Sequence, residues 1–139
     1  MIEVRHAPPE HYGWIAERAR LSISSEFRAL EALDAGQIVG MVGFDGWTPN
    51  SCSMHVAIEK PLAIRRLLRP AFGLVFDARP KGLGLGLVKG HVLSSNTKAL
   101  ALDLGLGFRE LGRVVDGWEV GVDEIMLVMR REDCKWATH

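Results

Sequence analysis

Two side chains near the middle of the chain have the chemistry of a proton acceptor. His55 carries an imidazole, which titrates near neutral pH, so it could serve as a general base. Glu59 follows on the same stretch and could play the same part through a bound water. The ordinary alternatives, a partly buried structural histidine and a surface carboxylate, stay open. No cluster of His, Cys and Asp residues has the spacing of metal ligands, so we predict no metal site.

A predicted strand over residues 52–58 must position His55. Successive side chains of a strand point to opposite faces, so Cys52 and Met54 share one face while His55 and Ala57 share the other. We therefore expect His55 to lie on the face opposite the more apolar one.

A long amphipathic helix is expected to follow this strand. Apolar residues recur at helical spacing from Ile64 to Phe76. Pro70 lies inside the stripe, where a proline costs about 3 kcal/mol. Because the stripe continues across Pro70, we predict one kinked helix and not two separate helices.

The remaining elements follow from alternation, helical spacing and turn residues. We predict further strands over 2–5, 27–33, 37–44, 85–93, 108–118 and 124–129, and helices over 10–19 and 96–104. The order is β-α-β-β-β-α-β-α-β-β. Hairpins in the first half and strand–helix–strand units in the second predict an α/β fold with a mixed central sheet flanked by helices.

Length and composition predict a single globular domain over residues 1–139. The chain is 47% hydrophobic and 24% charged, and its formal net charge is zero, which gives no electrostatic case for nucleic acid or a membrane surface. Cys52 and Cys134 fit two reduced thiols in a cytosolic protein. The first residues are too polar for a signal peptide and no apolar run approaches the ~20 residues of a membrane span, so we expect a cytoplasmic protein.

The segment over 95–108 carries the most specific motif of the chain. Asn96 is followed by an alanine and several leucines, and the segment ends in Gly-Phe. Together with the element order, this motif resembles the acyl-CoA-binding core of the GNAT (N-acetyltransferase) superfamily, over residues 27–129. In detail the chain looks like small members encoded by phages and prophages.

The resemblance implies acetyl-CoA as the acyl donor, bound in a gap between the strands over 52–58 and 85–93. It implies hydrogen bonds from the pantetheine arm to the edge of the first strand at Val56 and Ile58, as if a strand were added. It also implies a contact with Asn96, for which a plain helix N-cap is the alternative.

The resemblance further implies a pyrophosphate loop over residues 59–65 at the start of the following helix, and the predicted contacts there are Ala63, Ile64, Arg65 and Arg66. Two positions that are usually glycine in the family are Leu62 and Ile64 here, and Pro61 removes one amide donor. The two arginines could compensate by pairing with phosphate oxygens. A solvated helix face is their alternative.

The acid of the reaction departs from the family pattern. Many members protonate the leaving thiolate with a tyrosine seven residues after the asparagine, and that position is Asp103 here. An ionised carboxylate cannot donate a proton unless its pKa is raised. Ser94 or Ser95 could donate instead, with capping of the turn as the alternative. The resemblance also places Trp47 and Trp118 beside the acceptor pocket.

These expectations combine into an N-acetyltransferase that transfers an acetyl group from acetyl-CoA to an amine acceptor by direct attack. The acceptor would be a small molecule or a protein. The alternatives are a non-catalytic binding module with the same fold, and a phage-type modification enzyme that uses another acyl donor. An exposed edge in the C-terminal hairpin also suggests a homodimer.

Overall fold

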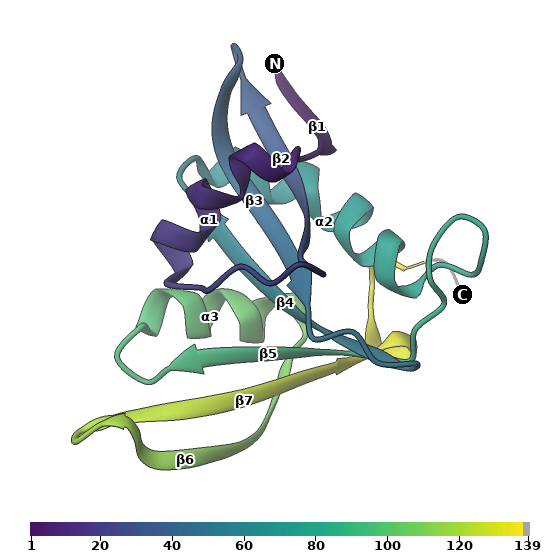
Figure 1. The fold of residues 1–139 in the computed structure, drawn as a ribbon. Helices are drawn as coiled ribbons and strands as arrows, with labels where there is room; N and C mark the ends of the chain where they lie inside the picture. The colour runs from purple at the N-terminus through teal and green to yellow at the C-terminus, as the bar shows by residue number, and fades with distance from the viewer. Residues whose placement is uncertain (138–139) are drawn as a thin grey trace.

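A single seven-stranded mixed sheet forms the centre of the computed structural model, which describes residues 1–137 (Figure 1). The last two residues of the domain predicted over 1–139 lie outside this description. The strands, in their order across the sheet, are β1 (Ile2–His6), β2 (Arg28–Asp34), β3 (Gln37–Asp45), β4 (Ser51–Ile58), β5 (Leu87–Leu93), β7 (Val122–Arg130) and β6 (Arg109–Glu119). This confirms the predicted mixed α/β sheet.

The helices also follow the predicted order. They are α1 (Tyr12–Ala19), α2 (Pro61–Phe76) and α3 (Thr97–Leu106), with short 3-10 turns at Pro9–His11 and Arg131–Asp133. α2 runs unbroken through Pro70, as the continuous apolar stripe predicted. No helix within residues 1–137 is both long and apolar enough to cross a membrane.

The two faces of the sheet carry separate apolar clusters. α2 and α3 pack on one face, where Phe72 of α2 meets Phe108 at a ring-centroid distance of 6.4 Å. α1 packs on the other face, where Ile15 joins a smaller cluster with Ala57. The predicted alternation along β4 is confirmed, since Cys52 and Met54 belong to the larger cluster.

The parallel pairing of β4 with β5 is short. All other neighbouring strands are antiparallel, whereas these two share only three residue pairs, from Ser51 with Leu87 to Ser53 with Lys89. β4 then continues to Ile58 and β5 to Leu93, so the strands diverge after the third pair. The divergence leaves the facing edges of both strands without a ladder.

Element boundaries shift where turn residues intervene. The strand predicted from residue 85 begins at Leu87, because the amides of Gly86 and Leu87 donate to the Asn50 carbonyl oxygen before the ladder starts. The helix predicted from residue 96 begins at Thr97, since Asn96 is its N-cap and accepts from the Ala99 amide at 3.2 Å. Both are corrections of one or two residues.

A buried carboxylate ties the N-terminal elements to the sheet. Glu31 of β2 is fully buried and accepts from Arg5 Nε at 2.8 Å, and its other oxygen lies 2.7 Å from His11 Nδ1. A buried charge is tolerated when it is paired in this way. The interaction fixes the segment that leads into α1. The sequence alone did not indicate that Glu31 would be buried and paired in this way.

Gly43 in β3 makes room for Phe27, and we expect Gly43→Ala to destabilise the protein. An added Cβ would lie 2.2 Å from Phe27 Cζ, so the ring would have to move. Overpacking of this kind typically costs about 1–3 kcal/mol. Urea unfolding should show a lower midpoint for this variant. The matched control is Gly13→Ala, because a Cβ at Gly13 meets nothing within 4 Å; equal midpoints for the two variants would contradict the prediction.

Candidate active site

A cavity of about 730 Å3 occupies the gap where β4 and β5 diverge. It is lined by residues 54–59 from the end of β4 and 90–93 of β5, by residues 18–21 at the end of α1, and by the first two turns of α3. Its volume suits a small organic ligand. Met54 and Val56 reach it from the α2 face, and His55 from the α1 face, so the cavity draws side chains from both faces of the sheet.

His55 forms a pair with Asp45 at the cavity wall. Its Nε2 lies 2.8 Å from Asp45 Oδ1, and the imidazole stacks on the Phe27 ring at 6.5 Å. A carboxylate only accepts hydrogen bonds, so Nε2 carries the hydrogen and Nδ1 keeps a lone pair. The pair can therefore orient the ring and accept a proton.

Asp45 was not identified from the sequence as the partner of His55, although the strand register would have indicated it. In the β3–β4 hairpin His55 lies opposite Gly43, so Asp45 is its diagonal neighbour on the same face. Counting the register through the loop over 46–50 would have found the pair.

Glu59 lies at the exposed rim of the cavity. Its carboxylate is 3.3 Å from Arg18 Nη2, and the Arg18 guanidinium stacks over the Trp14 ring at 3.9 Å. The ion pair joins the end of α1 to the end of β4. Since Glu59 is about half exposed, any role as a base would operate from the solvent side.

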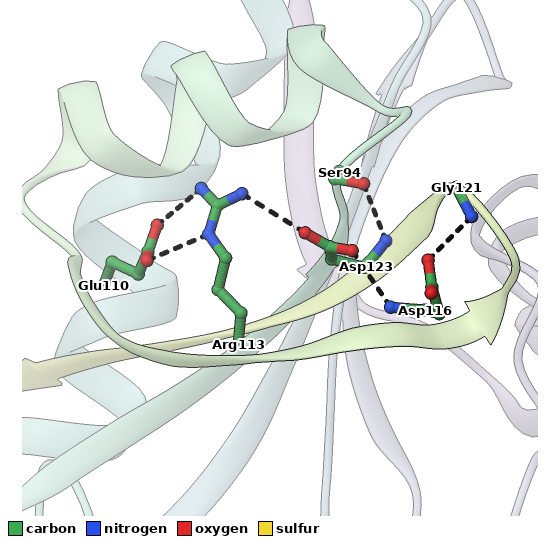
Figure 2. Close-up of polar contacts among 6 residues, drawn as sticks. All are labelled: Ser94, Glu110, Arg113, Asp116, Gly121 and Asp123. Atoms are coloured by element: carbon green, nitrogen blue, oxygen red, sulfur yellow. Dashed lines mark hydrogen bonds and ion pairs between the residues drawn. The ribbon is translucent and has the colours of Figure 1, made fainter.

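Ser94 and its neighbours form the turn between β5 and α3. Ser94 Oγ accepts from the Asp123 amide at 2.8 Å, which ties the turn to β7 (Figure 2). Ser95 and Asn96 line the cavity. The predicted contact residue Asn96 thus caps α3 and faces the cavity at the same time, whereas the Ser94 hydroxyl is turned toward β7.

Part of the amide set at the start of α2 is unavailable to a pyrophosphate. Pro61 has no N–H, the Lys60 amide donates to the Val39 carbonyl, and the Ala63 amide donates to the Lys60 carbonyl. The Ala63 side chain is fully buried against Gly40 of β3. Glu59 is the last residue of this segment that lines the cavity.

The predicted cofactor residues therefore divide into two groups. Val56, Ile58 and Asn96 surround the cavity. Ala63, Ile64, Arg65 and Arg66 lie beyond it on α2, and both arginines are exposed. Pro61 removes one amide donor, as predicted, and the hydrogen bonds show that the Lys60 and Ala63 amides are occupied as well.

Asp103 supplies an unusual carboxyl group to the cavity wall. Burial raises its pKa from the ordinary 3.8 to about 6. A substantial fraction of the group is then protonated near pH 6, so it can donate a proton where an ordinary aspartate cannot. The sequence showed Asp103 at the acid position, but the burial that changes its pKa depends on the packing of α3.

The remaining candidate groups differ in their relation to the cavity. Burial raises the pKa of the Cys52 thiol to about 12, which makes it a poor nucleophile. Trp47 donates from Nε1 to the Glu26 carbonyl at 2.8 Å and packs near Phe44, whereas Trp118 lines the cavity. Within residues 1–137, no three His, Cys, Asp or Glu side chains are grouped to hold a metal ion.

We expect Asp103→Asn to change the pH dependence of stability. The folded protein keeps a proton on Asp103 that the unfolded chain releases above pH 3.8, so this group lowers stability as the pH rises from 3.8 through about 6. Asparagine removes the titration. The variant should therefore gain roughly 1–3 kcal/mol of unfolding free energy relative to wild type above pH 6, and little below pH 4.

Urea titrations at several pH values measure this effect. Glu119→Gln on the exposed end of β6 is the matched control, and should leave the wild-type profile in place. If Asp103→Asn and wild type show parallel profiles from pH 4 to pH 7, the burial argument for Asp103 is wrong.

The sequence matches no protein-family profile and no curated protein. Solved structures share its architecture. A spermidine/spermine N-acetyltransferase, SpeG, from Vibrio cholerae in complex with manganese ions has a TM-score of 0.72 at 18% identity, covering 94% of this chain and 93% of that one. A spermidine N-acetyltransferase from the same organism, in complex with CoA and spermine, has a TM-score of 0.73 at 17% identity, covering 95% and 96%.

A third structure of the V. cholerae spermidine N-acetyltransferase, described as dodecameric and in an intermediate state, has a TM-score of 0.71 at 17% identity, covering 94% of each chain. At this level of identity the likeness establishes the fold. The chain therefore has the GNAT fold, as its element order and the motif at Asn96 indicated.

Proposed function

We propose that this protein is an N-acetyltransferase that transfers an acetyl group from acetyl-CoA to an amine by direct attack. The observation that carries the proposal is the cavity between β4 and β5, which opens where their parallel pairing stops after three residue pairs. The neighbour of the same fold that holds CoA and spermine supports both the donor and an amine acceptor.

The cavity fits the pantetheine arm of the donor. Beyond Ser53 the edge of β4 that faces β5 has no ladder, so its amides and carbonyls at Val56 and Ile58 can pair with an extended ligand as with an added strand. Asn96 and the first turn of α3 enclose the arm from the other side. The thioester of acetyl-CoA supplies the activated acetyl group.

The diphosphate needs a different partner here. With the Lys60 and Ala63 amides already bonded and a third amide absent at Pro61, guanidinium groups would add to the attraction of the remaining amides. We propose that Arg65 and Arg66 provide it, and that Ala63 and Ile64 shape the adjacent backbone.

The side chains of the cavity can move the two protons that the transfer requires. The amine nitrogen forms a bond to the acetyl carbon, and the carbon–sulfur bond breaks. We propose that His55, held by Asp45, accepts the proton that the amine loses. Glu59, acting through a water, is the alternative acceptor. Asp103 in its protonated form gives a proton to the departing sulfur. Ser94 stays a weaker candidate, because its hydroxyl is turned toward β7.

The start of α2 also favours a second candidate function. A GNAT-fold protein that has lost phosphate-binding amides could be a binding module without transferase activity. The two functions differ in acetyl-CoA binding, which calorimetry measures directly. Binding at micromolar to low millimolar concentration supports the enzyme, and no heat of binding at millimolar acetyl-CoA supports the module.

The homodimer stays a prediction. The edge that it would use is β6, the last strand of the sheet, on which Leu111 and Val115 are exposed. Sedimentation at several protein concentrations would test it.

We expect His55→Gln to lower kcat by about 10²- to 10³-fold, because a positioned general base contributes on that scale. The Kd for acetyl-CoA should change less than threefold, since glutamine keeps the polar contact with Asp45. Thiol release from acetyl-CoA, with an excess of amine, gives kcat. His6→Gln is the matched control, as His6 lies on β1 far from the cavity lining. Unchanged kcat in His55→Gln would remove His55 from the mechanism.

The acid role of Asp103 predicts a second signature. Because the carboxyl group must hold its proton, kcat should fall as the pH rises above about 6. Asp103→Asn should have a low kcat that no longer falls over this range. A wild-type kcat that rises steadily from pH 6 to pH 8, with saturating substrates, would exclude Asp103 as the acid.

A further inference from the structure

Four residues of β6, over 115–118, leave the ladder with β7. Val114 pairs with Glu124, and the next pair is Glu119 with Val122, so these four residues lie opposite Asp123 alone. Insertions of this kind re-aim side chains next to functional sites. The bulge therefore determines where its last residue, Trp118, points.

Hydrogen bonds that we call the hairpin clasp hold the bulge in place. Asp123 Oδ1 accepts from the Asp116 amide at 3.0 Å, and Asp116 Oδ1 accepts from the Gly121 amide at 2.8 Å (Figure 2). Asp123 Oδ2 lies 3.7 Å from Arg113, and the Asp123 amide donates to Ser94 Oγ. The clasp thus ties the bulge to the end of β5.

Close packing fixes the backbone of the bulge as well. A Cβ at Gly117 would lie 2.8 Å from Val114 Cγ1 and 2.9 Å from the Val114 carbonyl oxygen, so only glycine fits there without movement. Asp116 adopts a left-handed conformation with φ of 56°, which aspartate tolerates better than most residues. The left-handed Asp116 and the close contact at Gly117 indicate that the backbone of the bulge has one defined conformation.

This arrangement places Trp118 at the wall of the cavity. It lines the cavity while 51% of its surface stays exposed, so a ligand can cover it. It comes from the β5–β7–β6 side, across from the edge of β4 that we assign to the pantetheine arm. The face of Trp118 is therefore available to the second substrate.

The tip of the hairpin that carries Trp118 is acidic, in a chain whose net charge is zero. Residues 115–124 include Asp116, Glu119, Asp123 and Glu124 and no basic residue. Arg113 and His91 lie near two of these carboxylates, and the balance remains negative. Such a field attracts cations, and a tryptophan face stabilises an ammonium group by roughly 0.5–2 kcal/mol.

We propose that Trp118, held by the hairpin clasp, is the recognition wall for a cationic alkylamine acceptor. The proposal rests on the function proposed above and adds the chemical class of the acceptor and the residue that selects it. Asp116 and Asp123 are positioning residues in this scheme, since they act through the bulge. The amine docks as an ammonium ion on the Trp118 side and releases one proton to the solvent before its nitrogen attacks; the second proton, lost as the amide forms, goes to His55 as proposed above.

The test compares Trp118→Ala with wild type, using spermine and n-butylamine as cationic probes and aniline as a neutral one. We expect the KM for the cationic amines to rise at least tenfold, with the acetyl-CoA Kd within twofold of wild type. The wild-type KM for spermine should also rise with salt, as screening weakens the field of the hairpin. Val120→Ala is the control, because Val120 is 91% exposed on the same hairpin.

A second pair of variants tests the clasp. Asp123→Ala removes the acceptor of the Asp116 amide and should raise the amine KM as Trp118→Ala does. Asp123→Asn keeps an acceptor oxygen and should recover most of that loss. Circular dichroism and urea unfolding show whether each variant is folded, and spermine-dependent quenching of tryptophan fluorescence, absent in Trp118→Ala, gives a readout that does not depend on turnover.

Several results would overturn the proposal. If Trp118→Ala weakened acetyl-CoA binding and left the amine KM unchanged, Trp118 would contact the donor and not the acceptor. Turnover of aniline in preference to both cationic amines would exclude a cationic acceptor. If acetyl-CoA binds but neither cationic amine reacts or quenches fluorescence, this proposal fails and the acyl-donor part of the proposed function stands; if acetyl-CoA does not bind, the proposed function itself fails.

Discussion

The short parallel ladder between β4 and β5 is the constraint on which the site depends. Its amino-terminal end is pinned by Asn50, whose carbonyl oxygen accepts from the amides of Gly86 and Leu87 and whose side chain accepts from Gly86 at 3.0 Å. An added Cβ at Gly86 would lie 2.6 Å from the Asn50 side chain, so this close approach requires glycine. With the strands fixed at one end and joined by only three pairs, their other ends are free to diverge. The cavity, the open edge of β4 and the two-sided access all follow from that geometry.

The elements around the gap each contribute one constraint on the chemistry. β3 brings Asp45 beside His55 through the hairpin register, and the Phe27 ring fills the space that Gly43 leaves next to the same imidazole. The buried Glu31 fixes the approach to α1, whose end forms one rim of the cavity. α3 places Asp103 where burial raises its pKa to about 6. The proposed base and the proposed acid therefore come from elements on different sides of the cavity, which suits a reaction that removes one proton and supplies another.

Local sequence patterns predicted the helices and strands well. They could not predict which residues distant in sequence would contact one another. Alternation along β4 placed His55 and Ala57 on the α1 face, and the cap at Asn96 located the start of α3 within a residue. Pro61 predicted the loss of one amide at the start of α2, because proline has no N–H. By contrast, the divergence of β4 from β5, the burial of Glu31 and the state of Asp103 depend on residues distant in sequence. The four-residue bulge was not predicted either, because the sequence between residues 108 and 124 has the pattern of an ordinary hairpin.

The two substrates of the proposed reaction would be recognised by different kinds of group. The pantetheine arm would pair with backbone atoms along β4, which any sequence can provide as long as the strands diverge. The acceptor would meet side chains, and these depend on local choices such as the Trp118 bulge and the acidic residues around it. Structural neighbours at 17–18% identity can therefore share the fold while differing in the acceptor. Because part of the amide set at the start of α2 is committed, more of the donor affinity would come from the cavity itself, so the same gap would govern both the binding of the donor and its position for attack.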